Sequence, residues 1–412
     1  MPRPFRWRLC IILGPCFIAP ALAAYTQDPE EGQVPTLVRG AFTFVSSLGI
    51  EALDDSNIFE SSTDVQSSQL WKLAPRLLLQ FRPERSLLEF RYKGDYGWYD
   101  KSSVDDYADH ALQANAYLLL GGRGGLDLVV SYDAAHENRG TGLSAGIDPA
   151  SGAFPQDPDR YTTEQALARY TYGVSHTRAF VVFEASTDKI AYQNNLALTQ
   201  PFDRDESYGE ATFGFRIRSK TSLELSVQAI DITYDRSRAS GLNLDSQEYR
   251  YLLGVVWEAT GTTTGSVRVG GVTKKYDDPA VPDFSGPNWE VAIRWSPRTY
   301  SHFDLSTKRY VEEPITLTGT FTNAAVYSLS WSHEWSSRLE SKLALSEVEE
   351  TYHFATGNPR TDKSPQYSLA LIYKMRPWLR WEAGLDINAR DSPLAGYNYR
   401  ENIARLGARI TF

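Results

Sequence analysis

Cysteine is almost absent from the 412-residue sequence, and the little there is lies at its start. Cys10 and Cys16 fall in an opening segment that has three arginines, an apolar run over residues 9–19 and the small-x-small triplet Ala21-Leu22-Ala23. This order is typical of a secretory signal peptide cleaved after Ala23. The apolar run is too short to act as a membrane-spanning anchor. We therefore expect a mature chain with no disulfide and no thiolate metal site.

Long apolar runs and an excess of positive charge are also missing. After residue 23 no stretch is apolar enough for a transmembrane helix, and the mean hydropathy is −0.39. Loss of Arg3, Arg6 and Arg8 with the signal peptide lowers the Lys and Arg count from 42 to 39, against 51 Asp and Glu, so the mature net charge is near −12. A nucleic-acid partner would need a basic surface, so we expect none.

Aromatic residues, in contrast, are abundant, with 24 Tyr, 18 Phe and 10 Trp. The mature length would ordinarily suggest two or more soluble domains, yet no linker and no break in composition divides the chain. A β-barrel with a polar lumen and aromatic girdles predicts low hydropathy together with many aromatic residues. A secreted β-sandwich or β-propeller predicts only part of that combination.

Eighteen segments have the residue pattern of β-strands, and tight turns alternate with longer polar loops between them. An even number of strands places both termini at the short-turn end, which is the periplasmic end of an outer-membrane barrel. The predicted strands are residues 41–53, 69–81, 86–99, 109–120, 126–135, 163–174, 179–192, 207–218, 222–234, 247–258, 265–276, 288–295, 301–310, 322–335, 339–352, 365–373, 378–389 and 401–412.

The last of these segments shows the two-residue period of a strand most clearly. Alanine, leucine and isoleucine share one face, Arg405 and Arg409 lie on the other, and the chain ends on Phe412. Such a strand resembles the closing strand of an outer-membrane barrel. Residues 222–234 change phase halfway, and we predict a β-bulge near Ala229 to reconcile the two halves.

These patterns predict an all-β fold: a transmembrane antiparallel up-and-down barrel of about 18 strands in the outer membrane of a Gram-negative bacterium. The expected division is a signal peptide at residues 1–23, a periplasmic N-terminal segment at 24–40 and the barrel at 41–412. A barrel of 16–18 strands leaves an aqueous channel unless a loop plugs it. The longest predicted loop, residues 136–160, is our candidate for folding into the mouth.

Charged residues of both signs fall on the predicted inner faces. A mixed wall holds water and polar solutes without strong selection for one ion sign, and interleaved tyrosine and arginine would suit a polyhydroxylated chain. For any single residue, pairing with a charge on the next strand is an equally good explanation. The candidate lumen-lining residues are Lys72, Arg76, Glu89, Arg91, Lys93, Glu210, Arg216, Arg250, Glu290, Arg294, Arg380, Glu382, Asp386, Arg405 and Arg409.

Several short motifs go beyond a generic barrel pattern. They are DDSNIF at residues 54–59, WSPRT at 295–299, KRYVEE at 308–313, RTD at 360–362, RDS at 390–392 and YREN at 399–402. Together they resemble an outer-membrane β-barrel family of the beta-barrel porin 2 type, which is associated with exopolysaccharide and capsule biosynthesis loci. The resemblance implies a protein that assists polysaccharide export, and the family supplies no catalytic motif to transfer.

Catalytic and metal-binding patterns are not found in the sequence. None of the six histidines lies in a His-Glu-x-x-His or Gly-x-Ser-x-Gly context, and their spacing does not suggest convergence on a metal. His333 falls in phase with Trp331 and Trp335, so an aromatic-belt role is expected for it. The acidic pair Asp277-Asp278 and two others like it could bind Ca²⁺, although solvated loop charge explains them better. We predict no catalytic residue, no metal and no cofactor.

The sequence thus favours a pore that assists export of an exopolysaccharide or capsular polysaccharide. A general or oligosaccharide-uptake porin is the first alternative, and a barrel enzyme or adhesin acting through its loops is the second. The expected partners are outer-membrane lipid, the barrel-assembly machinery through the C-terminal strand, a polysaccharide chain and periplasmic export proteins.

Overall fold

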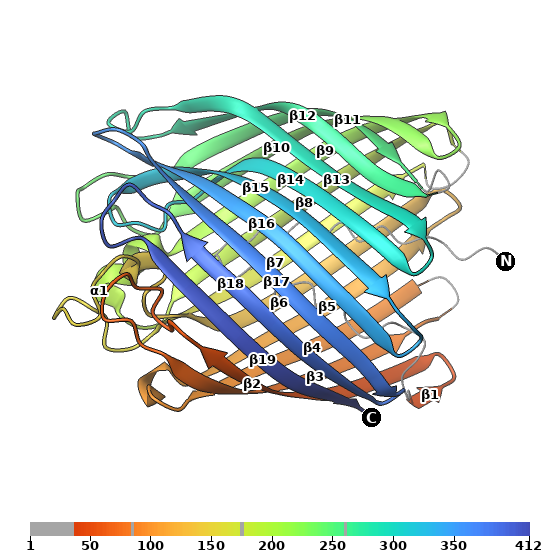
Figure 1. Ribbon diagram of the computed structural model, residues 1–412. Helices are drawn as coiled ribbons and strands as arrows, with labels where there is room; N and C mark the ends of the chain where they lie inside the picture. The colour runs from red at the N-terminus through yellow and green to blue at the C-terminus, as the bar shows by residue number, and fades with distance from the viewer. Residues whose placement is uncertain (1–36, 84–85, 174–176, 259–261) are drawn as a thin grey trace.

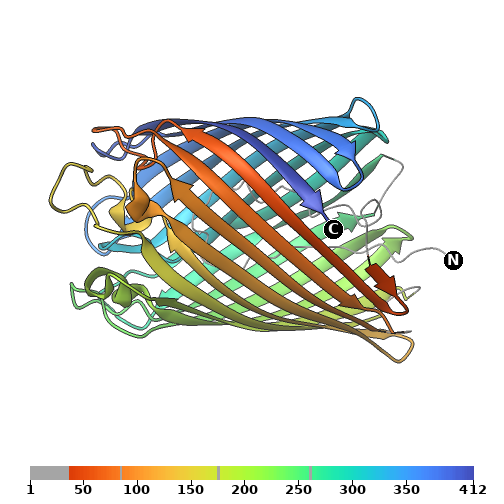
Figure 2. The same cartoon turned by 90° about the horizontal axis from the view of Figure 1, so that it is seen from below.

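A computed structural model describes residues 37–83, 86–173, 177–258 and 262–412, which form a closed antiparallel barrel of 18 strands (Figure 1). Each of β2 to β18 pairs with the next strand, and β19 pairs with β2, which closes the cylinder. Figure 2 shows the first and last of these strands side by side, red against dark blue. The barrel strands are β2 Phe42–Asp55, β3 Ser68–Phe81, β4 Ser86–Tyr99, β5 Tyr107–Leu120, β6 Gly124–Glu137, β7 Asp159–Tyr172, β8 Ala179–Tyr192, β9 Arg204–Arg218, β10 Thr221–Tyr234, β11 Ser246–Trp257, β12 Thr263–Tyr276, β13 Phe284–Arg298, β14 Ser301–Glu312, β15 Gly319–Glu334, β16 Leu339–Phe354, β17 Arg360–Arg376, β18 Leu379–Arg390 and β19 Tyr399–Thr411.

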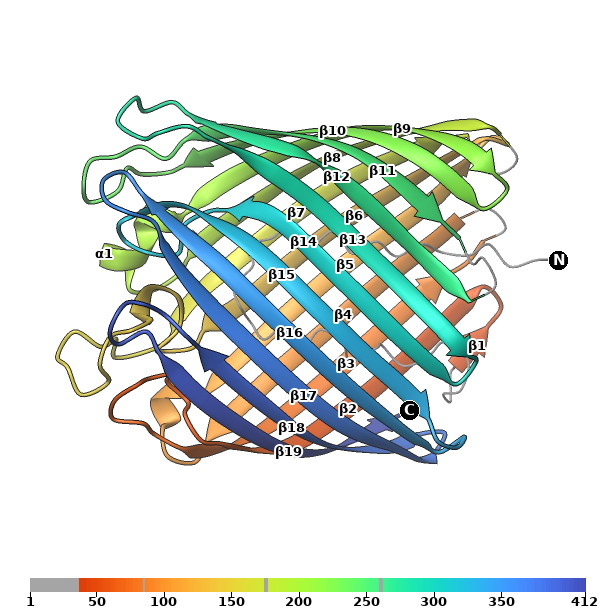
Figure 3. The same ribbon diagram turned by 45° about the horizontal axis from the view of Figure 1, so that its top comes forward.

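The two ends of the barrel differ in their connections. Long loops gather at one end and tight turns at the other, where the C-terminus also lies (Figures 1 and 3). In outer-membrane barrels these are the extracellular and periplasmic ends. Only short helical segments occur in the described part of the chain: η2 Ser103–Asp105, η3 Gly142–Ser144, α1 Leu196–Thr199 and η4 Gln200–Phe202. Within those described ranges, no helix is both long and apolar enough to cross a membrane.

The strands present an apolar face outward and a polar face inward. On β10, Leu223, Leu225 and Val227 are exposed, whereas the intervening Glu224 and Ser226 are buried. Since a closed barrel has only an outside and an inside, the exposed apolar side chains form the lipid-facing surface. The predicted fold class, strand count and closing strand are confirmed.

The predicted bulge near Ala229 is wrong. β10 keeps a continuous register with both neighbours through this residue, and its one irregularity lies between Thr221 and Ser222. Ile230, Ile232 and Tyr234 stay on the inner face and are buried. The sequence phase changes because the inside of the barrel becomes apolar near its extracellular end, not because the backbone shifts.

Strand limits were predicted less well where proline occurs. The strand predicted at residues 288–295 begins at Phe284 and includes Pro287, and the one predicted at 365–373 runs from Arg360 to Arg376 through Pro365. The pairing of β13 with β14 ends at Trp289, so Pro287 lies where β13 pairs only with β12. Proline has no N–H to donate, and at this position there is no β14 neighbour whose hydrogen bond would be lost, so the strand tolerates it.

The structure describes only part of the N-terminal region for which predictions were made. The signal peptide and residues 24–36 lie outside the described residues. Within the predicted periplasmic segment, β1 Leu37–Arg39 forms a short antiparallel pairing with the start of β2.

Candidate functional site

All the candidate lumen-lining residues lie on the inner parity of their strands, alternating with exposed apolar side chains. On β18, for example, Arg380, Glu382 and Asp386 alternate with the exposed Trp381 and Leu385. Most of the candidates pair with charges on the same strand or the next one. The inner wall is therefore a network of ion pairs, as the alternative interpretation of these charges proposed.

Near the seam, Arg405 of β19 joins two carboxylates of β18. Its Nη1 lies 2.6 Å from an oxygen of Asp386, and its Nη2 lies 3.8 Å from an oxygen of Glu382. Farther round the wall, Arg294 of β13 pairs with Asp304 of β14 at 2.6 Å. These contacts neutralise charge between adjacent strands.

Charged side chains also pair on the inner faces of β3 and β4. Arg91 pairs with Glu89 at 2.6 Å on the same strand, and Gln80 of β3 donates a hydrogen bond of 2.6 Å to the same carboxylate. Lys72 approaches Asp95 at 3.8 Å. Lys93 lies on the same inner face, where its side chain is exposed.

The β9–β13 side is more tightly packed. Glu210 accepts hydrogen bonds from Tyr208 and Thr212, at 2.5 Å each. Arg250 pairs with Glu248 at 2.5 Å. Arg268 of β12 contacts Glu224 of β10 at 2.8 Å and Glu290 of β13 at 3.4 Å. Its side chain therefore links three strands and reaches across the intervening β11.

Three arginines gather on the inner wall near the seam. Arg380 and Arg409 are register partners on β18 and β19, and Arg76 lies close by on β3. Gly49 of β2 makes room for them, since a Cβ at that position would lie 3.2 Å from the Arg409 guanidinium. Arg216, in contrast, hydrogen-bonds at 2.6 Å to the carbonyl of Thr177 in a periplasmic turn.

Sequence reasoning missed several partners of these residues, among them Asp304, Glu248 and Arg268. Each lies on an inner face in the expected phase, so alternation alone could have found it. Which charges meet depends on the register between strands, which the pattern within one strand does not contain.

A region of dense apolar packing lies at the extracellular end, and we term it the packed corner. Its buried residues are Tyr208, Ile230, Ile232, Tyr234, Leu244, Val272, Tyr276, Val281, Val311 and Phe321. Phe284 of β13 contacts Phe321 of β15 directly, with 4.8 Å between ring centroids, because β14 ends between them at Glu312. Apolar side chains thus fill the place where β13 and β14 separate.

An ion pair lies inside the packed corner. Glu313, in the β14–β15 loop, bonds to Lys274 of β12 and accepts a 2.5 Å hydrogen bond from the Tyr234 hydroxyl of β10. The side chains of Lys274 and Glu313 are 0% and 6% exposed. Burial by itself would raise the pKa of Glu313, but Lys274 and Arg204 outweigh it and hold that pKa below its usual range. The loop is therefore held inward against β10 and β12.

The β6–β7 loop, residues 138–158, reaches over another part of the mouth. Phe154 packs on Phe59 of the β2–β3 loop with 5.1 Å between ring centroids, and Arg139 pairs with Asp105 at 2.6 Å. Gly146 adopts φ +76°, and a Cβ there would lie 2.5 Å from the ring of Tyr397 in the β18–β19 loop. This loop is thus bound to three other extracellular connections.

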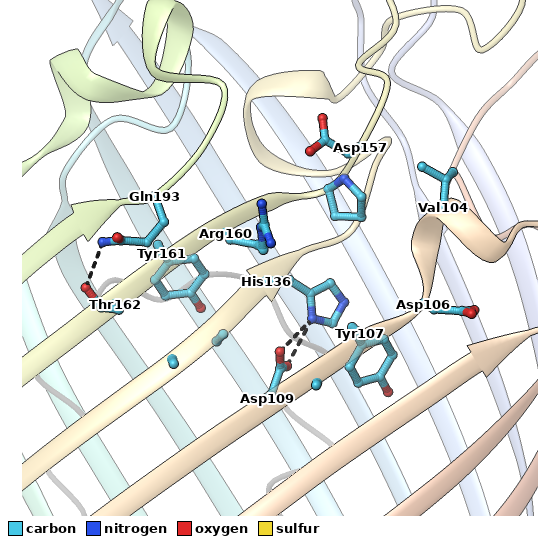
Figure 4. A pocket seen from close by; sticks show the side chains of 14 residues that line it. Val104, Asp106, Tyr107, Asp109, His136, Asp157, Arg160, Tyr161, Thr162 and Gln193 are labelled. Carbon is cyan, nitrogen blue, oxygen red and sulfur yellow. Dashed lines mark hydrogen bonds and ion pairs between the residues drawn. The ribbon is translucent and has the colours of Figure 1, made fainter.

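The wall also separates between β5 and β6, and we call this place the notch, formed by residues 107–109 of β5 and 135–137 of β6. The β5–β6 pairing ends at His110 and Ala134, although each strand continues for three residues paired with its other neighbour. His136 spans the separation through a 2.9 Å contact between its Nδ1 and Asp109 (Figure 4). The imidazole also stacks on Tyr107, with 4.1 Å between ring centroids.

A cavity of about 800 Å³ occupies the notch. Its lining includes Ala108 and Ala134 from the outer parity and Tyr107 and Tyr161 from the inner parity, so it passes through the line of the wall. Side chains rather than backbone hydrogen bonds hold the two strands together here.

His333 lies between Trp331 and Trp335, at 5.4 and 4.4 Å between ring centroids, as expected for the aromatic belt. Among the residues that the structure describes, no group of three or more His, Cys, Asp or Glu side chains is placed to hold a metal ion.

Comparison with known proteins gives one family and several similar structures. Residues 37–412 match the model of a family described as "Putative beta-barrel porin 2". A search of curated proteins finds no match. Among solved structures, OccK1 (OpdK) of Pseudomonas aeruginosa is 8% identical with a TM-score of 0.49, over 90% of this chain and 99% of that one. The FrpB iron transporter of Neisseria meningitidis is 11% identical with a TM-score of 0.45, over 89% and 81%. The siderophore receptor PirA of Acinetobacter baumannii is 8% identical with a TM-score of 0.43, over 89% and 80%.

Proposed function

The chain belongs to the "Putative beta-barrel porin 2" family of outer-membrane barrels, and from that membership we propose that it forms a water-filled pore for export of an exopolysaccharide or capsular polysaccharide. The observation that carries the proposal is the paired, mixed-sign inner wall. Neutralised pairs such as Arg405–Asp386 and Arg294–Asp304 offer hydrogen bonds to hydroxyl groups without a strong field of either sign. A long uncharged or weakly charged glycan can slide past such a wall.

Conductance in planar bilayers tests the pore. The mature chain should conduct with weak ion selectivity, and a neutral dextran narrow enough to enter should reduce the current. A barrel that never conducts, even with residues 138–158 deleted, would contradict a water-filled lumen. Unchanged conductance after that deletion would dismiss this loop as a plug.

The three-arginine cluster supplies a charge-reversal test of the same wall. Arg380→Glu with Arg409→Glu should shift selectivity toward cations, because two neighbouring positive charges on the lining become negative. Arg400→Glu is the matched control, since this arginine lies on β19 with the opposite parity and is exposed. Equal shifts from both variants would show that the cluster does not line the conducting path.

Loss of the gene tests the export role. A deletion strain should lose surface polysaccharide and regain it on complementation. Wild-type surface polysaccharide in the deletion strain, together with broad uptake of small solutes by the purified pore, would favour a general or oligosaccharide-uptake porin. We propose no catalytic activity, and the porin type of the family supports that view.

A further inference from the structure

We propose that the notch between β5 and β6 is a binding subsite for a neutral sugar ring. This inference deepens the proposed function and rests on it, because the sugar would belong to the glycan in transit. The notch lies at the extracellular end, so a ring bound there would be held as the chain leaves the barrel. The cavity of about 800 Å³ has room for one to a few sugar rings.

An aromatic ring beside hydrogen-bonding groups supports this choice of ligand. The ring of Tyr161 lines the cavity, and Thr162 and Gln193 bring a hydroxyl and an amide to the same lining. Tyr107 also borders the cavity, but its ring is already stacked on His136, so the aromatic face offered to a ligand is that of Tyr161. A sugar presents C–H groups on one face, which pack on aromatic rings, and hydroxyls at its rim. An acyl chain in the same place would leave the polar lining without partners.

The charges of the lining favour a neutral ring over an acidic one. Three carboxylates, Asp106, Asp109 and Asp157, surround the cavity, against the single guanidinium of Arg160 and the imidazole of His136. A uronate, sulfate or phosphate group would meet net like charge. The same carboxylates accept hydrogen bonds from sugar hydroxyls.

Arg160 is available to donate to such a ligand. Its guanidinium makes no hydrogen bond or ion pair with other residues in the described ranges, and Figure 4 shows the side chain beside the cavity without a dashed contact. Asp109, in contrast, is already engaged by His136. Arg160 therefore offers donors that a ligand can use without breaking an existing contact.

A glycan array carrying neutral and acidic oligosaccharides, probed with the detergent-solubilised mature chain, tests the proposal. Neutral oligosaccharides should be retained in preference to acidic ones. Tyr161→Ala and Arg160→Ala should each weaken binding of the best neutral oligosaccharide by about tenfold or more, as measured by titration calorimetry. Tyr161→Trp, which keeps an aromatic face, should bind better than Tyr161→Ala and guards against a mere folding defect.

Tyr132→Ala is the matched control, because Tyr132 lies on β6 but is exposed on the outer face. Its affinity should equal that of the unmodified chain. Retention of no neutral oligosaccharide, preference for acidic ones, or unchanged affinity in Tyr161→Ala would each overturn the notch proposal. Those results leave conductance and the deletion phenotype untouched, so failure of the subsite is distinguishable from failure of the export role.

Discussion

The barrel wall separates at its extracellular end both between β13 and β14 and between β5 and β6, and the two separations are filled differently. At the first, Phe284, Phe321 and the buried Lys274–Glu313 pair occupy the space. At the second, a cavity remains, and His136 reaches across it to Asp109 and Tyr107. The ladder ends early in both places, so backbone pairing does not explain the difference.

The nearby loops explain it instead. The β10–β11 and β12–β13 loops bring Leu244 and Val281, both buried, to the packed corner. The loops beside the notch bring Asp106, Asp157 and other polar residues. Apolar loop residues fold into a gap in the wall because burial removes them from water, whereas charged residues keep their hydration and leave the gap open. The first separation is thus structural, and the second is free to bind a ligand.

Removing the buried Lys274 side chain from the packed corner should have the largest effect on stability. Lys274→Ala should lower the free energy of unfolding by about 3–5 kcal/mol, because it leaves Glu313 buried without its partner. Denaturant unfolding followed by tryptophan fluorescence measures it. Lys275→Ala, an exposed neighbour on the outer face, should have little effect. If Lys274→Met with Glu313→Gln loses as much stability as Lys274→Ala, a stranded charge is not the cause.

Removing the Tyr234 hydroxyl, which also contacts Glu313, should cause a smaller loss of stability. Tyr234→Phe removes the 2.5 Å hydrogen bond and should lower the free energy of unfolding by about 1–3 kcal/mol, since the acceptor is charged and buried. Tyr249→Phe, on the outer face of β11, serves as the control. Equal stability of the two variants would show that the hydroxyl does not help hold the β14–β15 loop.

A substitution in the notch should lower the free energy of unfolding much less. His136→Ala should cost about 1 kcal/mol, because Asp109 then faces a cavity that can admit water instead of a dry interior. The same unfolding experiment measures it. A loss as large as that of Lys274→Ala would mean that the notch is a structural element, and the contrast between the two separations would fail.

The smallest expected effect is an opposite pH response of two extracellular loops. Burial raises the pKa of Glu60 in the β2–β3 loop above its usual 4.5, despite Arg390, whereas the pKa of Glu313 lies below 4.5. Acidification from about pH 7 toward 4.5 should therefore stabilise the β2–β3 loop as Glu60 takes up its proton. The β14–β15 loop should loosen only below 4.5, where Glu313 loses its charge. Hydrogen exchange of residues 56–67 and 313–318 would show parallel changes if this sign assignment were wrong.

Much of the fold could be predicted because its signals are local. The predicted strands 86–99 and 179–192 match β4 and β8 to the residue, since alternation and turn residues mark them on both sides. Prolines misled the prediction at Pro287, and an inward change from polar to apolar residues misled it at Ala229. Both errors have tertiary causes: a strand that has lost one neighbour, and loops packed inside the mouth.

By itself, the sequence determined the number of strands, their inner and outer faces and the end at which each loop lies, because a period of two and a turn are properties of a few consecutive residues. Only the tertiary structure decided which inner charges meet, that Glu313 is held by Lys274, and that β5 and β6 part to leave the notch. Those outcomes depend on register and on loops from distant segments, which closure of the barrel brings together.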